Sequence, residues 1–296
     1  MIESGKKTIY FFERGNPSPL GAALLPLSSN AVQYGMGLFE TMRVYSSVVP
    51  FLDEHLERAE RSMSILGLKC DLPREELKNT IYRSINESSI QEGSVKILFP
   101  VNDASFEISR YAVIVSGEIP YASDIHEQGG RAIILGWRKN SRSRLSGMKT
   151  FNYMENLLAR MEANRKGFDE AILLNEKGNI CEGAFSNLFF IKGKVIYTPS
   201  PGQGILSGIT RGKVIRIASQ SGFKIYEGKV AVSRIKDVHE AFMTSSLAEI
   251  ISLVEIGKIR IGNGIPGEKT RTLHDLYRRA IHNEIMKINS TLRRQV

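Results

Sequence analysis

Cysteine is scarce in this chain of 296 residues, which contains only Cys70 and Cys181. Two cysteines cannot build a disulfide framework, and this pair is not spaced like metal ligands. The five histidines are scattered along the sequence and form no HExxH pattern. The sequence therefore predicts neither a disulfide-stapled secreted protein nor a zinc enzyme, and we expect no bound metal.

Long hydrophobic runs are missing as well. No stretch approaches the ~18 apolar residues of a membrane-spanning helix, and the first residues lack the apolar core of a secretory signal. A hydrophobic content of 42% and a charged content of 24% are ordinary for a globular enzyme. We expect a cytoplasmic protein that does not bind membranes.

Positive charge is in excess, with a formal net charge of +9. Its densest runs are residues 137–144 and the tail 278–294. Nucleic-acid binding usually concentrates such charge beside stacking aromatics, and we do not expect it here. Two interpretations stay open: a solvated basic surface, and attraction of anionic substrates and of a phosphorylated cofactor.

The length predicts two domains. Residues 117–130 contain Pro120, Asp124 and a Gly-Gly pair, which makes them the best linker candidate. We therefore expect a small domain over 1–120, a linker over 121–130 and a large domain over 131–296.

Hydrophobic periodicity predicts helices and strands intermixed along the chain, the pattern of an α+β fold. Asp53 is the expected cap of a helix that runs to Leu66. The expected helices are 53–66, 73–87, 153–165, 210–221 and a last one from 270. The expected strands are 8–13, 38–45, 94–99, 110–116, 131–136, 170–174, 187–191, 195–198, 224–230 and 240–244. Residues 175–179 connect the strand 170–174 to a strand-like Ile180-Cys181, and such short connections within 170–198 predict antiparallel pairing.

Residues 262–267 match the GxGxxG pattern of dinucleotide-binding loops. Such a loop should follow a buried strand and open a helix, whereas this one is flanked by polar residues and contains Pro266. We interpret Gly262-Asn263-Gly264 as a hairpin turn instead.

Three separated segments carry chemistry that suits one phosphorylated aldehyde. Lys149 follows a glycine-containing turn, and a desolvated lysine amine can form an imine with an aldehyde. Glu182 can hold a ring nitrogen protonated, so that the ring accepts electrons from a carbanion. Gly208-Ile209-Thr210 opens a predicted helix and offers backbone N–H groups to a phosphate. Pyridoxal 5′-phosphate needs all three.

With these segments the chain resembles the fold-type-IV pyridoxal-phosphate enzymes: branched-chain aminotransferases, D-amino-acid aminotransferases and 4-amino-4-deoxychorismate lyases. The resemblance covers nearly the whole chain. Its motifs are Tyr34-Gly35-Met36-Gly37-Leu38-Phe39-Glu40-Thr41-Met42-Arg43, His55-Leu56-Glu57-Arg58, Lys149-Thr150-Phe151-Asn152-Tyr153, Asp169-Glu170-Ala171, Glu182-Gly183-Ala184-Phe185-Ser186-Asn187, Gly208-Ile209-Thr210-Arg211 and Thr244-Ser245-Ser246-Leu247-Ala248-Glu249.

The resemblance implies a small N-terminal α/β domain, a larger cofactor domain with an antiparallel-rich sheet, and a homodimer. It implies that Lys149 forms the internal aldimine and moves the α-proton, and that Glu182 binds the pyridine nitrogen. The other cofactor contacts that it implies are Tyr153 on the ring oxygen, Leu206 on the ring face, and Arg58, Ile209, Thr210 and Ser246 on the phosphate.

Two departures from the family pattern lie in the small domain that shapes the substrate pocket. Gly35-Met36-Gly37 stands where the family usually has Gly-Asp-Gly, and Ser29-Asn30 stands where it usually has Asp-Arg. The resemblance therefore specifies the cofactor better than the substrate. Our candidates for substrate binding are Tyr34, Phe39, Arg43, Lys96, Arg144 and Leu247.

Three functions remain. The first, which we favour, is an aminotransferase that exchanges nitrogen between an amino acid and a 2-oxo acid; Glu249 in the loop after Ser246 resembles the transaminase version. The second is a lyase that releases pyruvate and 4-aminobenzoate from aminodeoxychorismate, and residues 145–160 resemble that enzyme. The third is a non-catalytic basic binding protein, which need not have kept both Lys149 and Glu182.

Overall fold

The computed structural model describes residues 2–4, 7–13, 16–17, 25–70, 72–101 and 106–294. The chain divides into two compact units, and the division is not contiguous in sequence. The first unit comprises residues 1–120, 148–152 and 281–296, and the second comprises 121–147 and 153–280. The expected linker 121–130 falls in the second unit and contains a short helix, α4 (Ile125–Gln128).

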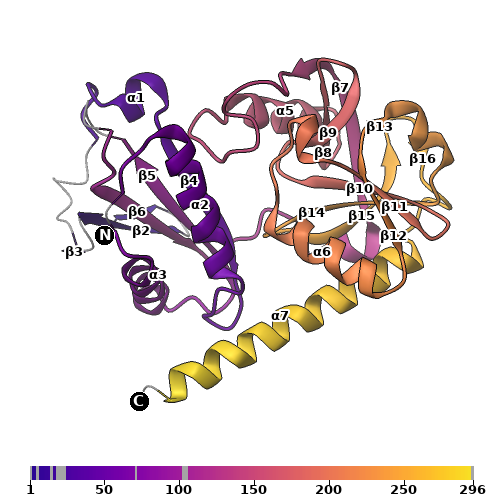
Figure 1. Cartoon of the computed structure of the whole chain (residues 1–296). Coiled ribbons are helices and arrows are strands. Elements are labelled where there is room, and N and C mark those ends of the chain that lie inside the picture. The colour runs from indigo at the N-terminus through magenta and orange to yellow at the C-terminus, as the bar shows by residue number, and fades with distance from the viewer. Residues whose placement is uncertain are drawn as a thin grey trace. The chain divides into compact units, whose positions relative to one another are not determined.

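One antiparallel sheet forms the centre of the first unit (Figure 1). Its strands lie in the order β1-β2-β6-β5-β4, and β3 pairs with β2. Their bounds are β1 (Ile2–Ser4), β2 (Lys7–Glu13), β3 (Asn16–Pro17), β4 (Gly37–Val44), β5 (Gly93–Pro100) and β6 (Arg110–Ser116). The helices of this unit include α1 (Asn30–Tyr34), α2 (Leu52–Leu66) and α3 (Arg74–Ser88).

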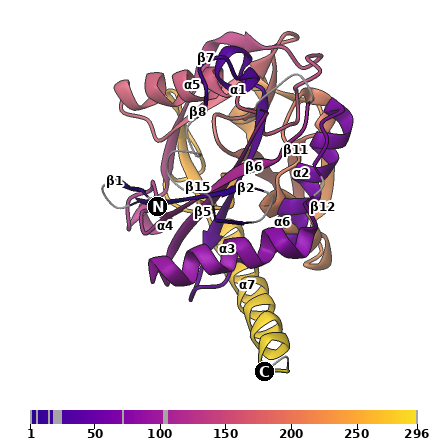
Figure 2. The same ribbon diagram turned by 90° about the vertical axis from the view of Figure 1, so that its left-hand side faces the viewer.

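Helices α2 and α3 cover one face of this sheet, α2 on β4 and α3 on β5 and β6; Figure 2 shows α3 on the near side. Side chains alternate along a strand, so Leu38, Met42 and Val44 face the helices and are buried with Leu56 of α2. Residues 39, 41 and 43 therefore point to the opposite face.

Helices α2 and α3 agree with the expected spans, but the predicted cap of α2 was wrong. The helix begins at Leu52, and Phe51 occupies the cap position with a φ of 60°. Asp53 lies inside the first turn of the helix rather than at its cap. There its negative charge interacts favourably with the helix dipole.

The second unit contains a ten-stranded sheet with the order β12-β11-β10-β14-β15-β7-β8-β9-β13, and β16 pairs with β15. Three neighbour pairs, β11–β12, β7–β15 and β7–β8, are parallel and the others antiparallel. The bounds are β7 (Gly130–Lys139), β8 (Glu170–Asn175), β9 (Asn179–Gly183), β10 (Asn187–Lys192), β11 (Val195–Pro199), β12 (Lys224–Gly228), β13 (Val230–Ala231), β14 (Glu240–Ser245), β15 (Glu249–Ile256) and β16 (Ile259–Arg260).

Helices pack on this second sheet at two places, with α5 at the top of the unit in Figure 1 and α6 at the bottom. Helix α5 (Met154–Arg165) packs on β7 and β8, and α6 (Ile209–Gln220) packs on β12 and β14. Two 3₁₀ turns, Pro201–Gln203 and Val232–Asp237, and the long helix α7 (Glu268–Arg294) complete the described chain. None of the helices in the described part combines the length and the apolar character that a membrane crossing requires.

These sheets and helices confirm the expected α+β class and the antiparallel pairing of β8 with β9 and of β10 with β11. The expected hairpin at Gly262-Asn263-Gly264 was wrong. Strands β15 and β16 turn at Gly257, and the Gly262–Gly264 segment follows β16 as a separate turn before α7. A hairpin at Gly262–Gly264 would need a longer run of alternating apolar and polar residues before the turn, and β16 has only two residues.

Candidate active site

Lys149 lies in a short segment that pairs with the edge of β4. The Phe39 N–H donates a hydrogen bond of 2.9 Å to the Lys149 carbonyl, and the Phe151 N–H donates one of 2.9 Å to the Gly37 carbonyl. Thr150 forms the bridge with Leu38. This pairing places the Lys149 Nζ 4.5 Å from the centre of the Phe39 ring. The lysine is thus fixed through backbone hydrogen bonds to a strand.

Two glycines make room for this segment. A Cβ on Gly37 would lie 2.5 Å from the Phe151 ring, and one on Gly35 would lie 2.9 Å from Asn152 Oδ1. Gly35 also adopts a φ of 64°, which favours glycine. The Asn152 amide donates to the Gly35 carbonyl over 3.0 Å. The glycines of the Gly-Met-Gly departure therefore accommodate the lysine segment.

A buried ion triad fixes Arg58 of α2. Arg58 Nε and Nη2 donate to the two oxygens of Glu40 on β4, over 2.8 and 2.6 Å. His55 Nδ1, one helical turn before Arg58, lies 2.8 Å from Glu40 Oε2. All three side chains are buried.

The charges in this triad shift its pKa values. Burial alone would raise the pKa of Glu40, but the Arg58 charge and the hydrogen bonds from Arg58 and His55 outweigh it and lower the pKa to about 2. Burial lowers the pKa of His55, and the Arg58 and Lys149 charges lower it further against the effect of Glu40. Glu40 is therefore an anion that orients Arg58, and His55 is neutral near pH 7.

The face of the first sheet that is turned away from α2 and α3 is cationic. Lys96 of β5 lies opposite Thr41 of β4, and its Nζ is 4.4 Å from the centre of the Phe39 ring. Burial and the Lys7 charge lower the pKa of Lys96. Arg43 lies on the same face, with its guanidinium 5.2 Å from the centre of the Tyr45 ring. Lys149, Lys96 and Arg43 thus supply positive charge on one side of the sheet.

In the second unit, Glu182 of β9 is buried, and both its oxygens are engaged. Lys139, the last residue of β7, forms a close ion pair with Oε1. The backbone N–H of Leu206 donates to Oε2 over 2.7 Å. The carboxylate therefore connects β9, β7 and the loop that precedes α6.

That loop is held against its neighbours by small residues. The Asn187 amide donates to the Leu206 carbonyl over 2.8 Å, and a Cβ on Gly208 would lie 2.2 Å from Asn187 Oδ1. Ser146 Oγ donates to the Gly204 carbonyl over 3.1 Å. Gly208, the residue before α6, is therefore closely packed against Asn187.

Helix α6 starts at Ile209, with Gly208 at its cap and no side-chain cap. The first N–H groups of a helix have no partner inside it, so this end can bind an anion. The Thr210 hydroxyl is 3.2 Å from the Tyr277 hydroxyl of α7. Burial raises the pKa of Tyr277, which keeps this phenol protonated.

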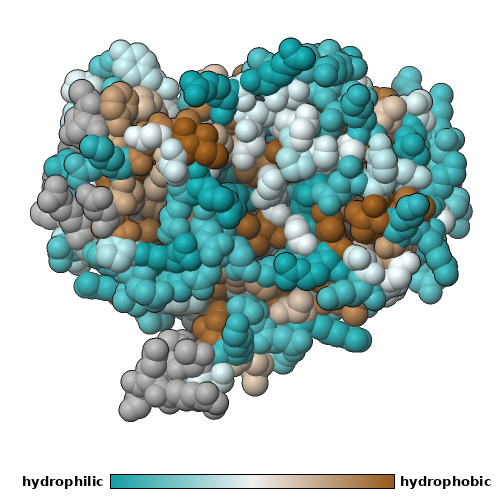
Figure 3. Space-filling view, in the orientation of Figure 1, coloured by the Kyte–Doolittle hydropathy of each residue, from teal (hydrophilic) through white to brown (hydrophobic). Residues whose placement is uncertain are grey.

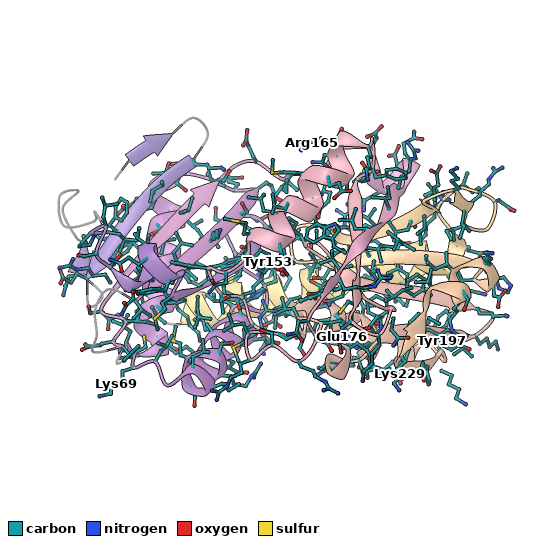
Figure 4. All side chains as sticks on the ribbon, turned by 90° about the horizontal axis from the view of Figure 1, so that it is seen from above. Lys69, Tyr153, Arg165, Glu176, Tyr197 and Lys229 are labelled. Carbon is teal, nitrogen blue, oxygen red and sulfur yellow. The ribbon has the colours of Figure 1, made fainter. Side chains whose placement is uncertain are left out.

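The remaining candidates are in turns and at helix ends. Ser246 and Leu247 are half-buried in the turn between β14 and β15, where the Ala248 N–H donates to Ser245 Oγ over 3.0 Å. Tyr153 precedes α5, at the opposite end from Arg165 (Figure 4), and its ring is 5.6 Å from that of Phe185. Arg144 is exposed in a loop, and Tyr34 at the end of α1 is 65% exposed.

Comparison with known proteins places this arrangement in a family. The model of the family described as amino-transferase class IV matches residues 37–256, which include most of the residues above. The chain belongs to the class IV aminotransferases.

Relatives within this family carry names of branched-chain aminotransferases, of an aminodeoxychorismate lyase and of a D-alanine aminotransferase. A putative branched-chain-amino-acid aminotransferase of Methanocaldococcus jannaschii is 31% identical over 261 residues, 86% of this chain and 91% of the relative. An aminodeoxychorismate lyase of Bacillus subtilis is 30% identical over 272 residues, 89% of this chain and 92% of the relative. The solved branched-chain amino acid aminotransferase from Escherichia coli is 27% identical, with a TM-score of 0.81 over 93% of this chain and 94% of that one.

Class IV aminotransferases use pyridoxal 5′-phosphate, which confirms the expected cofactor. Another solved branched-chain amino acid aminotransferase, with a TM-score of 0.84, contains pyridoxamine 5′-phosphate. Of the candidate residues, Lys149, Phe39, Lys96 and Arg58 are in the first unit, where Lys149 and Lys96 contact the Phe39 ring, and Glu182, Leu206, Ile209 and Thr210 are in the second, where Leu206 contacts Glu182. Among the described residues, no group of three or more His, Cys, Asp or Glu side chains is arranged to hold a metal ion.

Sequence reasoning missed four residues that hold the candidates in place: Glu40, His55, Lys139 and Tyr277. Glu40 had a signal, because alternation along β4 places a carboxylate among the buried Leu38 and Met42. His55 and Arg58, three residues apart, share one face of a helix. No sequence signal pointed to Lys139, because it lies in the basic run 137–144, which we interpreted as solvated or anion-attracting surface.

Proposed function

We propose that this protein is a pyridoxal-phosphate-dependent aminotransferase that moves an amino group between an amino acid and a 2-oxo acid. The observation that carries the proposal is the position of Lys149. Its segment is hydrogen-bonded to β4, and its amine lies over the Phe39 ring, near enough for its charge to lower the pKa of the buried His55. A lysine held in a partly buried place by backbone pairing suits imine chemistry and proton transfer better than a surface lysine does.

The described residues of both units fit the cofactor by their chemistry. Arg58, oriented by Glu40, suits a phosphate, and so does the uncapped start of α6 at Ile209 and Thr210. Glu182, kept from water and hydrogen-bonded on both oxygens, suits a protonated ring nitrogen. We assign the ring face to Leu206, the ring oxygen to Tyr153 and a further phosphate contact to Ser246.

Bound pyridoxal phosphate supplies an aldehyde and a ring that stabilises negative charge at the substrate α-carbon. Lys149 would hold the aldehyde carbon through its Nζ, and the same Nζ would carry the α-proton of the substrate. Glu182 holds the proton on the ring nitrogen throughout. Arg58 and the N–H groups of α6 keep the phosphate in place while the amine partners change.

Substrate carboxylates are bound, in this proposal, by the cationic face of the first sheet. Lys96 and Lys149 contact the same Phe39 ring, and Arg43 is on the same face. A half-buried lysine is a strong point charge for a carboxylate. We leave smaller substrate roles to Tyr34, Phe39, Arg144 and Leu247. Replacement of Lys96 by alanine should raise the KM for the 2-oxo acid about tenfold or more while kcat changes less.

A second candidate is the lyase reaction, in which aminodeoxychorismate yields pyruvate and 4-aminobenzoate. The observation in its favour is the Bacillus subtilis lyase, which is nearly as similar to this chain as the aminotransferase relative is, at 30% against 31% identity. Both reactions need a carbanion at the α-carbon, so Lys149 and Glu182 serve either.

Two incubations separate the candidates. In the first, the purified protein receives single amino acids with 2-oxoglutarate, and glutamate is measured. In the second, it receives aminodeoxychorismate with no amino acceptor, and pyruvate is measured. Glutamate that forms only when the 2-oxo acid is present supports the aminotransferase. Pyruvate without an acceptor, and no glutamate, would replace it with the lyase.

We propose further that the protein is a homodimer. Apolar side chains occur singly and in patches on the polar surface that Figure 3 shows. Helix α5 carries a regular row of them at positions i, i+3, i+4 and i+7: Met154, Leu157, Leu158 and Met161, with exposures of 72%, 52%, 48% and 41%. Such a stripe on a helix usually packs against another surface.

The stripe can be tested by light scattering after size-exclusion chromatography. Leu157→Lys should convert the dimer to a monomer, whereas Met286→Lys, at an exposed apolar residue of α7, should leave it a dimer. A monomeric wild-type protein would contradict the homodimer proposal.

A further inference from the structure

Lys139 is the one member of the basic run 137–144 whose amine is hydrogen-bonded to a buried carboxylate that we assign to the cofactor. Its Nζ forms the close ion pair with Glu182 Oε1, and its side chain is only 19% exposed. Lys139 reaches this place because β7 continues to residue 139, where it pairs with Asn175 of β8. Strand β9, which carries Glu182, lies on the other side of β8 from β7.

The ion pair keeps Lys139 charged. Burial alone would lower the pKa of Lys139, but the charge and the hydrogen bond of Glu182 outweigh it and raise the pKa. Two other titratable groups, Cys181 beside Glu182 and Glu155 of α5, also raise the pKa of Lys139, and Glu176 of the β8–β9 turn acts on Cys181. Burial raises the pKa of Cys181 to about 12, so this thiol is neutral near pH 7.

The pair also fixes direction. With Oε1 on Lys139 and Oε2 on the Leu206 N–H, the carboxylate of Glu182 cannot rotate without losing a hydrogen bond. An ionised carboxylate has about four lone-pair sites, so each oxygen can still accept a further donor. Leu206, our candidate for the ring face, is tied to the same carboxylate that is our candidate for the ring nitrogen.

We propose that Lys139 is a positioning residue for the cofactor ring: its amine supplies the counter-charge of Glu182 and holds one of its oxygens, and so sets the direction in which this carboxylate meets the ring nitrogen. The proposal rests on the assignment of Glu182 in the proposed function. Lys139 itself touches no reacting atom in this account.

The test is the pH dependence of cofactor binding by apoprotein. Wild type, Lys139→Met, Lys139→Gln and Lys139→Arg are stripped of cofactor, and the dissociation constant for pyridoxal phosphate is measured by absorbance between about pH 5 and pH 9. Lys192→Met is the matched control, because Lys192 pairs with Asp237 at the surface of the same unit over 3.7 Å. Circular dichroism of each apoprotein verifies folding.

A carboxylate that loses a close cation partner takes up a proton about 1–3 pH units higher. In Lys139→Met and Lys139→Gln, the pH below which binding weakens should therefore rise by about that much, and Lys139→Arg should restore the wild-type profile. The second neutral variant keeps the test valid if the methionine variant does not fold.

Three results would overturn the proposal. A neutral variant with the wild-type pH profile shows that the charge of Lys139 has no role. An arginine variant that behaves like the neutral ones shows that the residue acts through packing alone. If wild type binds no pyridoxal phosphate at all, the proposed function fails first, and this inference fails with it.

Discussion

Each of the two units stabilises a charged group with a counter-ion, and the signs of the two charges are exchanged between the units. In the first unit a cation that suits a phosphate, Arg58, is held by the buried anion Glu40. In the second unit an anion that suits a ring nitrogen, Glu182, is held by the half-buried cation Lys139. In each case the counter-ion offsets part of the cost of burying a charge.

The two pairs differ in what surrounds them. Glu40 and Arg58 are on a strand and a helix of the core, and one side of the pair is locked by His55. Glu182 is tied to the end of β7 and to a loop whose shape depends on close packing at Gly208. Loss of the Glu40–Arg58 pair should therefore have the larger effect on the free energy of unfolding. Loss of the Lys139–Glu182 pair should affect cofactor binding more than folding.

The largest effect on stability is expected from Glu40→Gln. This substitution removes one partner of a buried pair and leaves Arg58 with an uncompensated charge. The free energy of unfolding should fall by about 3–5 kcal/mol, as measured by urea denaturation. Glu57→Gln is the control, since Glu57 pairs with Arg74 where both side chains are 33–43% exposed, and it should change stability by less than ~1 kcal/mol. Equal stabilities of the two variants would refute the role of the triad.

Acid should weaken the first unit through the same groups. The pKa of Glu40 is lowered to about 2 and that of His55 is lowered from 6.5, so both groups bind protons more readily in the unfolded chain. Their stabilisation is complete above about pH 6.5 and is lost progressively as the pH falls, first through His55 and then, below about 4.5, through Glu40. The melting temperature should drop progressively as the pH falls from 7 to about 2. A Glu40→Gln variant should lose the part of that drop below about pH 4.5.

The loop that precedes α6 in the second unit can be tested by replacing each of two glycines with alanine. Gly208→Ala places a methyl group against Asn187 Oδ1 and should cost about 1–3 kcal/mol, with weaker binding of pyridoxal phosphate. Gly212→Ala, one turn later in α6 where the methyl group meets open space, should stabilise the protein by up to about 1 kcal/mol and leave binding unchanged. Equal binding by both variants would contradict the packing argument.

Local patterns were sufficient for much of the fold. Helices α2 and α3 follow from apolar residues at helical spacing, and β8 to β11 follow from short apolar runs with short connections. The end of β7 did not follow, because Arg138 and Lys139 are charged and suggest a loop, yet they pair with β8. The hairpin was misplaced because Gly262 and Gly264 are stronger turn signals than Gly257.

For the site, the sequence indicated the chemistry of individual residues but not the residues that hold them in place. Lys149, Glu182 and Thr210 were found because each is in a segment with a distinct chemical use. The pairing of Lys149 with Phe39, and of Lys139 with Glu182, joins residues that are far apart in the sequence. No local period encodes such contacts, so they required the structure.

The central claim, that Lys149 carries the cofactor, is tested most directly by reduction with borohydride. The protein incubated with pyridoxal phosphate is reduced and digested, and its peptides are analysed by mass spectrometry. We predict a phosphopyridoxyl group on Lys149 and none on Lys96, which contacts the same Phe39 ring. A modification on Lys96 with Lys149 unmodified, or no modification at all, would contradict the account.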